Sequence, residues 1–253
     1  MRVVSLSPSL TEIIQYLGCE AQLAAITSDC PEDIQKPRLL SPKAISLADL
    51  DLFSKDTILF DEYEVAPELA QAIKKSFHTI AFDIRSIDHV SRCVSDLGRL
   101  LRSEEKANQL NTDIYHEVQL CKTENAGIQP IRFLTLIWNR PQLTTNFDHY
   151  ISRMVELCGG FNVFHAEPLR EFPVEIEQMI EKKPDLLILP KKPYPFQKRH
   201  ISKLREYRVF SKCVIELVDG SFFSRFGPRT VVALQTIRQL VVSARQKVVV
   251  TKE

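Results

Sequence analysis

The chain alternates short apolar runs with longer amphipathic segments, and this alternation starts twice. The first start is the apolar run 2–6, followed at once by a Ser-Pro-Ser motif at 7–9 that is typical of a helix N-terminus. The second is the apolar run 131–137, followed by a helical pattern over 148–158 that a Gly-Gly pair ends. A strand that leads into a helix is therefore expected near the beginning of each half of the chain.

The same spacing rules predict the remaining elements. In the first half we expect strands at 2–6, 23–27, 57–61 and 78–82, with helices at 9–17, 46–53, 65–76 and 87–102. In the second half we expect strands at 131–137, 185–189 and 213–218, with helices at 148–158, 174–182, 197–207 and 229–245. The apolar run 248–250 is expected to add only a surface contact. This order predicts an α/β fold in which helices cover parallel sheets.

One predicted helix is long enough to join two lobes. It begins at Ser103 and keeps helical spacing to about Thr123, and about 20 residues at 1.5 Å each span roughly 30 Å. We therefore expect an N-terminal α/β lobe over 1–102, a single connecting backbone helix over 103–127 and a C-terminal α/β lobe over 128–253. Two Rossmann-like lobes of this kind would hold a ligand in the cleft between them. A rigid helical connector would allow only small closure around that ligand.

Composition and charge exclude several functions. The chain has 253 residues, is 44% hydrophobic and carries a net charge of +1, so nothing in its overall charge favours a nucleic-acid partner. No run of about 18 apolar residues is present, so no membrane span is expected. The N-terminus lacks the apolar stretch of a signal peptide. We expect a cytoplasmic protein if Met1 is native, and a periplasmic or surface-exposed one if the chain is a trimmed mature form.

The six cysteines occur singly, and none forms a Cys-x-x-Cys pair. A zinc ribbon or a thioredoxin-type site is therefore not expected. Most of them lie in apolar surroundings and are expected to be buried thiols in a reducing compartment. Cys30 follows the apolar run 23–27, and because the carboxyl end of a strand can face a cleft, it is either another buried thiol or a residue that touches the ligand.

Four segments, in the same order along the chain, carry a resemblance to a known family. They are Val-Ser-Leu-Ser-Pro-Ser-Leu-Thr-Glu at 4–12, Met-Val-Glu-Leu-Cys-Gly-Gly-Phe-Asn-Val-Phe at 154–164, Lys-Pro-Asp-Leu at 183–186 and Gly-Pro-Arg at 227–229. Together they resemble the vitamin B12 and iron-siderophore binding proteins, the helical-backbone, class III periplasmic-binding-protein superfamily. The closer likeness is to cobalamin-binding members that lack a signal peptide. The resemblance implies a non-catalytic binding protein related to the substrate-binding proteins of ABC transporters.

The resemblance also implies particular ligand-binding residues. Phe172, Phe222 and Phe223 match positions where cobalamin binders place aromatic side chains against the corrin ring, and Tyr194 lies in a segment seen in the signal-less members. Aromatic rings suit this task, because a flat and largely apolar macrocycle is held by contact with rigid faces and edges. The expected ligand is therefore a cobalamin, bound as cargo and not as a catalytic cofactor.

Other candidates follow from their positions in the predicted elements. Trp138 comes just after the first strand of the second lobe, where parallel sheets place ligands. Asp61 ends the third strand and could accept hydrogen bonds from corrin amides. Ser7 is expected to cap the first helix more than to meet the ligand. Together with Cys30 and Arg225, these residues complete the predicted ligand-binding set.

This chain differs from the transporter-coupled members of that superfamily in one feature. Those members present an acidic residue on each lobe, which pairs with arginines of the membrane permease. The second-lobe position is Ser224 here, and the first-lobe position aligns with Ala48, beside Asp49 and Asp51. This departure weakens the expectation of an ABC permease as partner. A cytoplasmic carrier, salvage or sensing role is an equal interpretation.

Alternative functions stay open from the sequence. Haem or a siderophore would require basic or tyrosine side chains, and Arg140, Arg225 and Tyr194 are available. A bare metal ion would require histidines and carboxylates, but none of the six histidines ends a first-lobe strand, so no metal ligands are assigned. No nucleophile elbow, P-loop or dinucleotide fingerprint occurs, so no catalytic residue is assigned. An enzyme with Cys30 as nucleophile remains the catalytic alternative, and it would require a reactive, accessible thiol.

Overall fold

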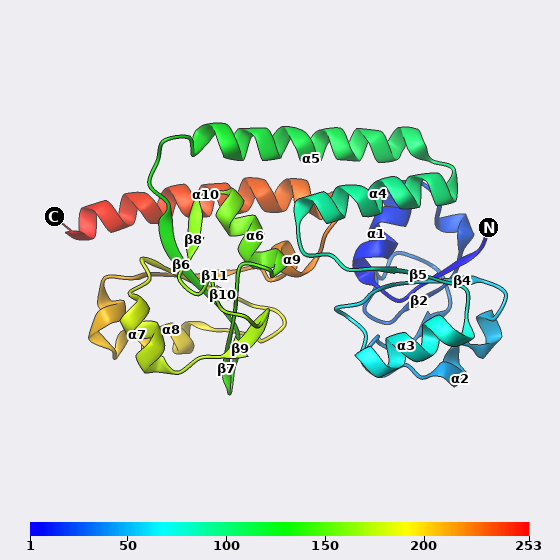
Figure 1. The fold of residues 1–253 in the computed structure, drawn as a ribbon, viewed down its shortest axis with the longest axis horizontal. Coiled ribbons are helices and arrows are strands. Elements are labelled where there is room, and N and C mark those ends of the chain that lie inside the picture. The colour runs from blue at the N-terminus through cyan, green and yellow to red at the C-terminus, as the bar shows by residue number, and fades with distance from the viewer. Residues whose placement is uncertain (253) are drawn as a thin grey trace. The chain divides into compact units, whose positions relative to one another are not determined.

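The computed structural model describes residues 1–252, and they form two compact units. The first unit comprises residues 1–84, 88–114 and 225–228. The second comprises residues 85–87, 115–224 and 229 onward. Each unit has its own sheet with helices packed on it, which confirms the predicted α/β class (Figure 1). Among the described residues, no helix has the length and apolar character needed to cross a membrane.

The first sheet is parallel throughout and has the order β3-β2-β1-β4-β5. Its strands are β1 (Val3–Ser5), β2 (Leu23–Thr27), β3 (Arg38–Leu39), β4 (Thr57–Asp61) and β5 (Thr79–Phe82). Every residue of β1, β2 and β4 is buried, as expected for central parallel strands that are covered on both faces.

Helices supply that cover in the first unit. They are α1 (Pro8–Tyr16), α2 (Leu47–Leu50), α3 (Pro67–Ser76) and α4 (Ile87–Leu101), with short 3-10 turns η1 (Glu20–Gln22) and η2 (Asp51–Phe53). Figure 1 shows α1 and α4 on one face of the sheet and α2 and α3 on the other. Leu6, Ile58, Phe60 and Ile73 are fully buried within the core that the sheet shares with the second of these layers.

The second sheet is mixed and has the order β11-β10-β6-β7-β9, with β8 paired to β6 beside this path. Its strands are β6 (Ile131–Asn139), β7 (Gln142–Thr145), β8 (Gly160–Asn162), β9 (Glu171–Pro173), β10 (Leu186–Pro190) and β11 (Val214–Val218). The pairs that join β6 to β8, β6 to β10 and β10 to β11 are parallel, whereas β7 runs antiparallel to β6 and β9.

The helices of the second unit lie on both faces of this sheet. They are α6 (Tyr150–Leu157), α7 (Ile176–Lys182), α8 (Lys198–Arg205), η3 (Arg208–Ser211), α9 (Ser221–Ser224) and α10 (Pro228–Lys252). Figure 1 shows α6 and α10 on one face and α7 and α8 on the other. The core between the sheet and α7 and α8 contains Leu134, Leu187, Met179 and Phe210.

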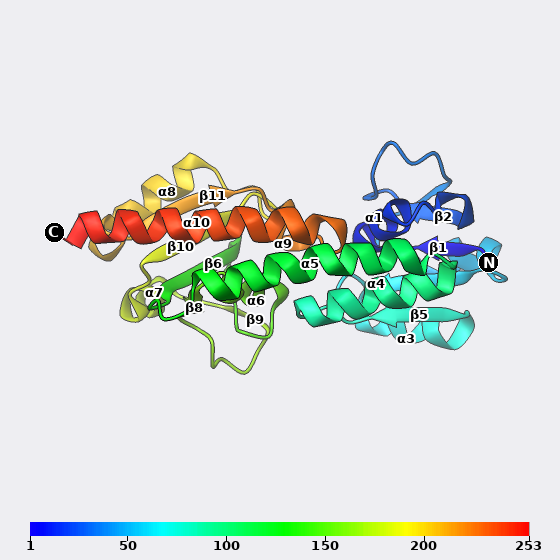
Figure 2. The ribbon, with the colours of Figure 1, turned by 90° about the horizontal axis from the view of Figure 1, so that it is seen from above.

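The predicted long helix is α5 (Glu104–Glu124), and it passes from the first unit to the second after Ile114. Its second half packs beside α10 (Figure 2). Gln235 donates a hydrogen bond to Glu117 Oε1 at 2.7 Å, and Arg238 pairs with Glu124 at 2.6 Å. The end of α5 is therefore fixed to α10 by polar contacts.

All predicted helices and strands are present in the predicted order, and the differences concern short elements. The sequence patterns missed β3, β7, β8 and β9, none of which exceeds four residues. The last helix was expected to end near residue 245, but α10 continues through Val248 to Lys252, since no glycine or proline interrupts it. The expected surface packing of Val249 and Val250 concerns side chains outside the described part of the chain.

The turn before α10 contains Gly227, which belongs to the first unit and packs closely against α1. Gly227 has φ +91°, and a Cβ atom there would lie 2.4 Å from Ile13 Cγ1, which is fully buried in α1. We expect Gly227→Ala to lower the free energy of unfolding by about 2 to 4 kcal/mol, because strain at positive φ adds to overpacking. Urea unfolding followed by circular dichroism measures this change.

Gly127→Ala is the matched control. Gly127 also has positive φ, at +71°, but a Cβ atom there meets nothing within 4 Å. Its replacement should cost only the backbone strain, about 1 kcal/mol. Equal losses for the two variants would contradict a close packing of Gly227 against α1.

Candidate functional site

The candidate site in the first unit follows from the strand order of its sheet. The connections from β1 lead to β2 and β3 on one side, whereas β4 and β5 lie on the other. The carboxyl ends of β1 and β4 therefore flank the point where the strand order reverses, which is where open α/β sheets bind ligands. Ser7 follows β1 and Asp61 ends β4, so the structure brings these two predicted site residues to the same edge.

Ser7 occupies the N-cap position of α1, but its side chain does not act as a cap. Its hydroxyl makes no hydrogen bond to the helix, and Oγ is buried without a partner in the described structure. The carbonyl oxygen of Ser7 instead accepts hydrogen bonds from the Ser5 and Thr11 hydroxyls, at 3.0 and 2.9 Å. The predicted capping role of Ser7 is therefore wrong, because a buried hydroxyl network engages its backbone and leaves its side chain unused.

Asp61 and Glu64 place two acids beside Ser7. Asp61 is buried, and its Oδ1 accepts a hydrogen bond from the Tyr63 amide at 3.1 Å. Glu64 Oε2 is buried without a hydrogen-bond partner in the described structure. Burial raises the pKa of Glu64 to about 7; the nearby Ser7 hydroxyl and Arg225 oppose this shift, and Asp61 adds to it. Near neutral pH this carboxyl is therefore partly protonated and can donate a hydrogen bond.

The position of Glu64 in the sequence did not indicate a site residue, whereas Asp61 was predicted because it ends the strand. The intervening acid Glu62 is exposed and pairs with Lys74. The signal that could have found Glu64 is the run of three acids within four residues after a buried strand. Which of them turns inward depends on the loop conformation.

Arg225 is held on α1 by an ion pair with Glu12, and its Nη2 donates to the Asp29 carbonyl at 3.2 Å. The next residue, Phe226, donates its amide to Ser9 Oγ at 3.3 Å. These contacts fix the segment 225–228 on the first unit. Arg225 is thus a positioned cation whose charge Glu12 already balances.

Cys30 lies inside the first unit and does not offer an accessible thiol. It is 4% exposed, and its Sγ lies 3.2 Å from the Thr11 hydroxyl and 3.3 Å from the Thr27 hydroxyl. A reactive thiolate is usually exposed, whereas this thiol is buried between two hydroxyls.

The second sheet has its own reversal of strand order, between β6 and β10. From β6 the parallel path leads to β8 on one side, whereas β10 and β11 lie on the other. Trp138 lies near the end of β6, at a bulge in the hairpin with β7, and Tyr194 follows β10. The two rings meet edge to face with their centroids 5.4 Å apart, and Trp138 remains 40% exposed.

Hydrogen bonds hold Tyr194 in place. Asn139 Nδ2 donates to the Tyr194 hydroxyl oxygen at 3.1 Å, and His200 Nε2 lies 3.4 Å from it. His200 Nδ1 accepts the Gln197 amide at 2.8 Å, which puts the proton of the neutral imidazole on Nε2. Burial and Arg199 lower the pKa of His200, which favours this neutral form. The Tyr194 oxygen therefore accepts twice, and its own proton is available to another acceptor.

The three predicted phenylalanines have different surroundings. Phe172, in β9, is half-buried and packs edge to face on Phe164, with centroids 5.5 Å apart. Phe222, in α9, is half-buried. Phe223 is only 2% exposed, so it packs inside the protein and presents almost no surface to a ligand. Since successive residues in a helix point in different directions, only one of the adjacent pair keeps an accessible face.

The loops that follow β10 and β11 are in contact. A Cβ atom on Gly220 would lie 2.5 Å from the backbone nitrogen and oxygen of Lys192, so this glycine allows the close approach. The segment that carries Tyr194 and the turn that precedes Phe222 are thereby packed together. Trp138, Tyr194 and Phe222 thus come from the carboxyl ends of three adjacent strands, β6, β10 and β11.

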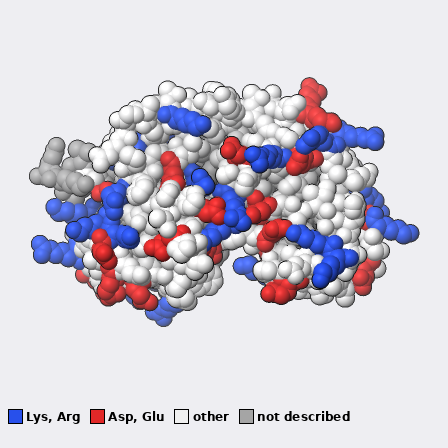
Figure 3. All heavy atoms as spheres, viewed as in Figure 1, with Lys and Arg blue, Asp and Glu red and all other residues white. Residues whose placement is uncertain are grey.

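Ser224 and Asp49 lie at or beside the positions that align with permease-docking acids. Ser224 is exposed at the end of α9. Asp49 is half-buried, and its carboxylate accepts hydrogen bonds from the backbone amide and the hydroxyl of Ser46 at 2.8 and 2.7 Å. These hydrogen bonds lower the pKa of Asp49 and engage it in a capping box at the start of α2. Basic and acidic side chains are interspersed on the face shown in Figure 3, in keeping with the balanced charge.

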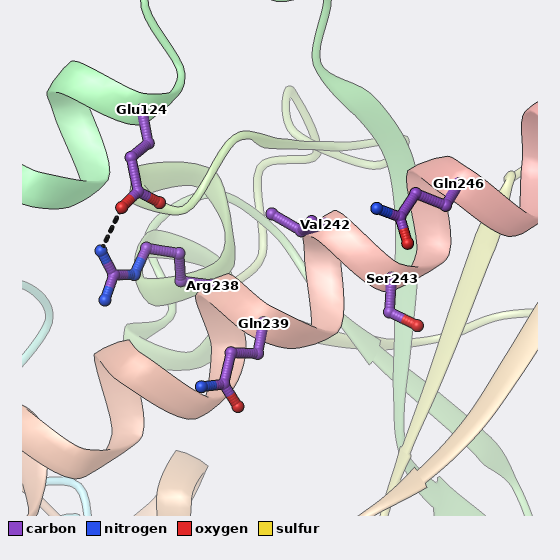
Figure 4. A pocket seen from close by; sticks show the side chains of 6 residues that line it. All are labelled: Glu124, Arg238, Gln239, Val242, Ser243 and Gln246. Atoms are coloured by element: carbon purple, nitrogen blue, oxygen red, sulfur yellow. Dashed lines mark hydrogen bonds and ion pairs between the residues drawn. The ribbon is translucent and has the colours of Figure 1, made fainter.

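Two features lie outside the predicted site. The described residues contain no group of three or more histidine, cysteine, aspartate or glutamate side chains placed to hold a metal ion. His149 is buried with Nδ1 accepting the Ile151 amide, and burial lowers its pKa to about 3. An open hollow of about 320 Å³ lies against α5 and α10, and none of the predicted site residues lines it (Figure 4).

Glu64 gives the first unit a pH-dependent stability. Because the pKa of Glu64 is raised in the folded protein, its protonated side chain contributes fully to the free energy of unfolding below about pH 4.5. This contribution is lost as the pH rises through about 7. We expect Glu64→Gln to abolish this loss, so that the stability of the variant relative to the wild type rises by about 2 kcal/mol between pH 5 and pH 8. Urea unfolding at both pH values measures the difference. Glu62→Gln, at an exposed neighbour, is the control, and an identical pH dependence in all three proteins would contradict a buried Glu64.

Similarity to known proteins extends over nearly the whole chain. Residues 3–213 match the model of the family described as "Periplasmic binding protein". The vitamin B12-binding protein of Pectobacterium carotovorum subsp. carotovorum (strain PC1) is 26% identical over 246 residues, which cover 93% of this chain and 86% of that protein. The vitamin B12-binding protein of Vibrio cholerae (strain M66-2) is 26% identical over 190 residues, which cover 74% and 69%.

Solved structures share the same fold. The periplasmic vitamin B12 binding protein BtuF of Vibrio cholerae aligns with a TM-score of 0.79 and 23% identity, covering 96% of this chain and 97% of that one. The periplasmic heme-binding protein RhuT from Roseiflexus sp. RS-1, in its apo form, aligns with a TM-score of 0.80 and 21% identity, covering 98% of each chain. The family match spans far more than half of the described residues, and the two-sheet fold agrees with it. The chain belongs to the periplasmic binding protein family.

Proposed function

We propose that this protein binds a cobalamin or a closely related corrinoid without transforming it. The observation that carries the proposal is the aromatic group of Trp138, Tyr194 and Phe222 at the strand-order reversal of the second sheet. Rings at this place can hold a flat macrocycle by edge and face contact. The names of the relatives, which are vitamin B12-binding proteins, support this choice of ligand.

Haem is the second candidate, and a specific observation supports it. The Tyr194 oxygen has two hydrogen-bond donors beside it, Asn139 and His200. A tyrosine oxygen can bind ferric iron, and the structural neighbour RhuT is a heme-binding protein.

We further propose that the protein acts as the substrate-binding component of an ABC transporter. The family supports this role, and the structural neighbours BtuF and RhuT are periplasmic proteins, which favours the periplasmic or surface location over the cytoplasmic one. Coupling to a permease would depend on acids other than Asp49, whose carboxylate caps α2. Fractionation of cells that carry the native gene tests the location, and recovery with the cytosol would contradict it.

Titration of the purified protein tests the ligand. Trp138 is the only tryptophan, and its ring is partly exposed, so cyanocobalamin or haem bound against it should quench its emission. We expect saturable quenching by cyanocobalamin at micromolar or lower concentration, confirmed by calorimetry. Tyr194→Ala and Phe222→Ala should each weaken binding about tenfold, since each removes a ring that contacts the macrocycle.

Phe161→Ala is the matched control in the same unit. Phe161 is 43% exposed in β8 and is not part of the aromatic group, so its loss should leave the affinity unchanged. Quenching by haem but not by cyanocobalamin would favour haem, the second candidate, as the ligand. Absence of heat and of quenching with both macrocycles would refute the proposed function.

The absence of catalysis is a proposal that alkylation of Cys30 can test. Because Cys30 is buried between two threonine hydroxyls, we expect iodoacetamide to modify it slowly in the native protein and rapidly after denaturation. Mass spectrometry of the peptide that contains Cys30 measures both rates. Modification of native Cys30 faster than that of free cysteine would revive the enzymatic alternative.

A further inference from the structure

Two cysteines that are distant in sequence meet inside the second unit. Cys121 lies in the last turn of α5, and Cys158 follows the end of α6. Their Sγ atoms are 3.5 Å apart, and each residue is at most 1% exposed. The sequence did not indicate this pair, since 37 positions separate the two residues.

The other cysteines have different surroundings. Cys30 contacts two threonine hydroxyls, Cys19 contacts the carbonyl oxygens of Leu17 and Leu101, and Cys213 contacts that of Val214. All six cysteines lie in the described part of the chain, where the thiols of Cys121 and Cys158 contact each other. This pair therefore differs from a set of isolated buried thiols.

The Arg238 guanidinium lies near both thiols. The two Sγ atoms are in hydrogen-bond contact, and the positive charge of Arg238 favours the thiolate form of either cysteine. The thiolate is the form that attacks a disulfide, so this cation supports the first step of disulfide formation.

Arg238 also connects the pair to the surface. It acts electrostatically on both thiols and lines the open hollow between α5 and α10, where it pairs with Glu124 (Figure 4). Cys158 Sγ in turn contacts the Leu234 carbonyl oxygen in α10 at 3.7 Å. Displacement of this part of α10 would expose the thiols to a reagent in the hollow.

We propose that Cys121 and Cys158 are a disulfide-forming pair, joined when the protein folds or opens locally in the presence of a disulfide oxidant. The thiolate of one of the two cysteines attacks one sulfur of the oxidant, forms a mixed disulfide and expels one thiolate. The other cysteine then loses its proton to water and attacks the sulfur of the first, which expels the second thiolate. Two protein thiols are oxidised and one external disulfide is reduced to two thiols, so electrons and protons balance.

The bond would act on the part of the second unit that carries the aromatic group. It would close a loop that contains β6 with Trp138, the hairpin to β7 and α6. A cross-link of this length stabilises mainly by restricting the unfolded chain. The inference does not depend on which ligand the protein binds, because it rests only on the thiol geometry.

The test compares reduced protein with protein refolded in a glutathione redox buffer that contains glutathione disulfide. After acid quenching and alkylation under denaturing conditions, peptide mapping identifies the linked cysteines. We expect one cross-linked peptide pair that joins Cys121 to Cys158, four alkylated cysteines, and a thermal midpoint about 5 to 10 °C above that of the reduced protein.

Variants separate this bond from other effects of oxidation. Cys158→Ala should lose the cross-link and the oxidation-dependent rise in thermal midpoint. Cys213→Ala, which removes another buried cysteine of the same unit, should keep both. Wild-type protein that retains six free thiols after oxidative refolding, or that links other cysteines, would overturn the proposal. This mapping requires only the wild-type protein, so a variant that fails to fold leaves the decisive measurement intact.

Discussion

The candidate sites depend on one constraint, which is the parallel pairing of strands on both sides of a central pair of strands. In the first sheet the reversal lies between β1 and β4, and in the second it lies between β6 and β10. Chain connections leave such a point toward opposite sides, so the strand ends there are not covered by a crossover. Ser7, Asp61, Trp138 and Tyr194 all lie at these ends because the backbone hydrogen-bond ladders put them there. Their side chains can vary without changing the ladders.

The first unit retains polar groups that a merely structural core would not need. Ser7 Oγ and Glu64 Oε2 are buried without partners among the described residues, and such groups typically destabilise a protein by about 1 to 3 kcal/mol each. The Arg225–Glu12 ion pair is different, because its two charges satisfy one another and fix the 225–228 segment on α1. Ser7 and Glu64 lie near one another at the reversal point, where polar groups remain close to the strand ends.

The sequence predicted the long elements and the edges at which the sites lie, but it did not predict which side chains are available. Apolar runs and helical spacing are local signals, and they identified the central strands and α5 within a few residues. The hairpin strand β7 was missed because its Gln-Leu-Thr-Thr sequence resembles a polar loop, and its pairing with β6 and β9 is a tertiary effect. Ser7, Glu64 and Phe223 differ from expectation for the same reason. Their exposure and partners depend on residues distant in sequence.

The aromatic group alone cannot account for tight binding, and this bears on the ligand. Three partly exposed rings that each cover about 60 Å² of a macrocycle would contribute on the order of 5 kcal/mol at about 25 cal/mol per Å². Association itself costs about as much or more, so aromatic contacts of this size leave little net affinity. The ligand must therefore carry polar groups that find partners elsewhere on the chain. A corrinoid has both a ring for the aromatic side chains and many polar amides, whereas a purely apolar macrocycle would leave polar partners on the protein without hydrogen bonds.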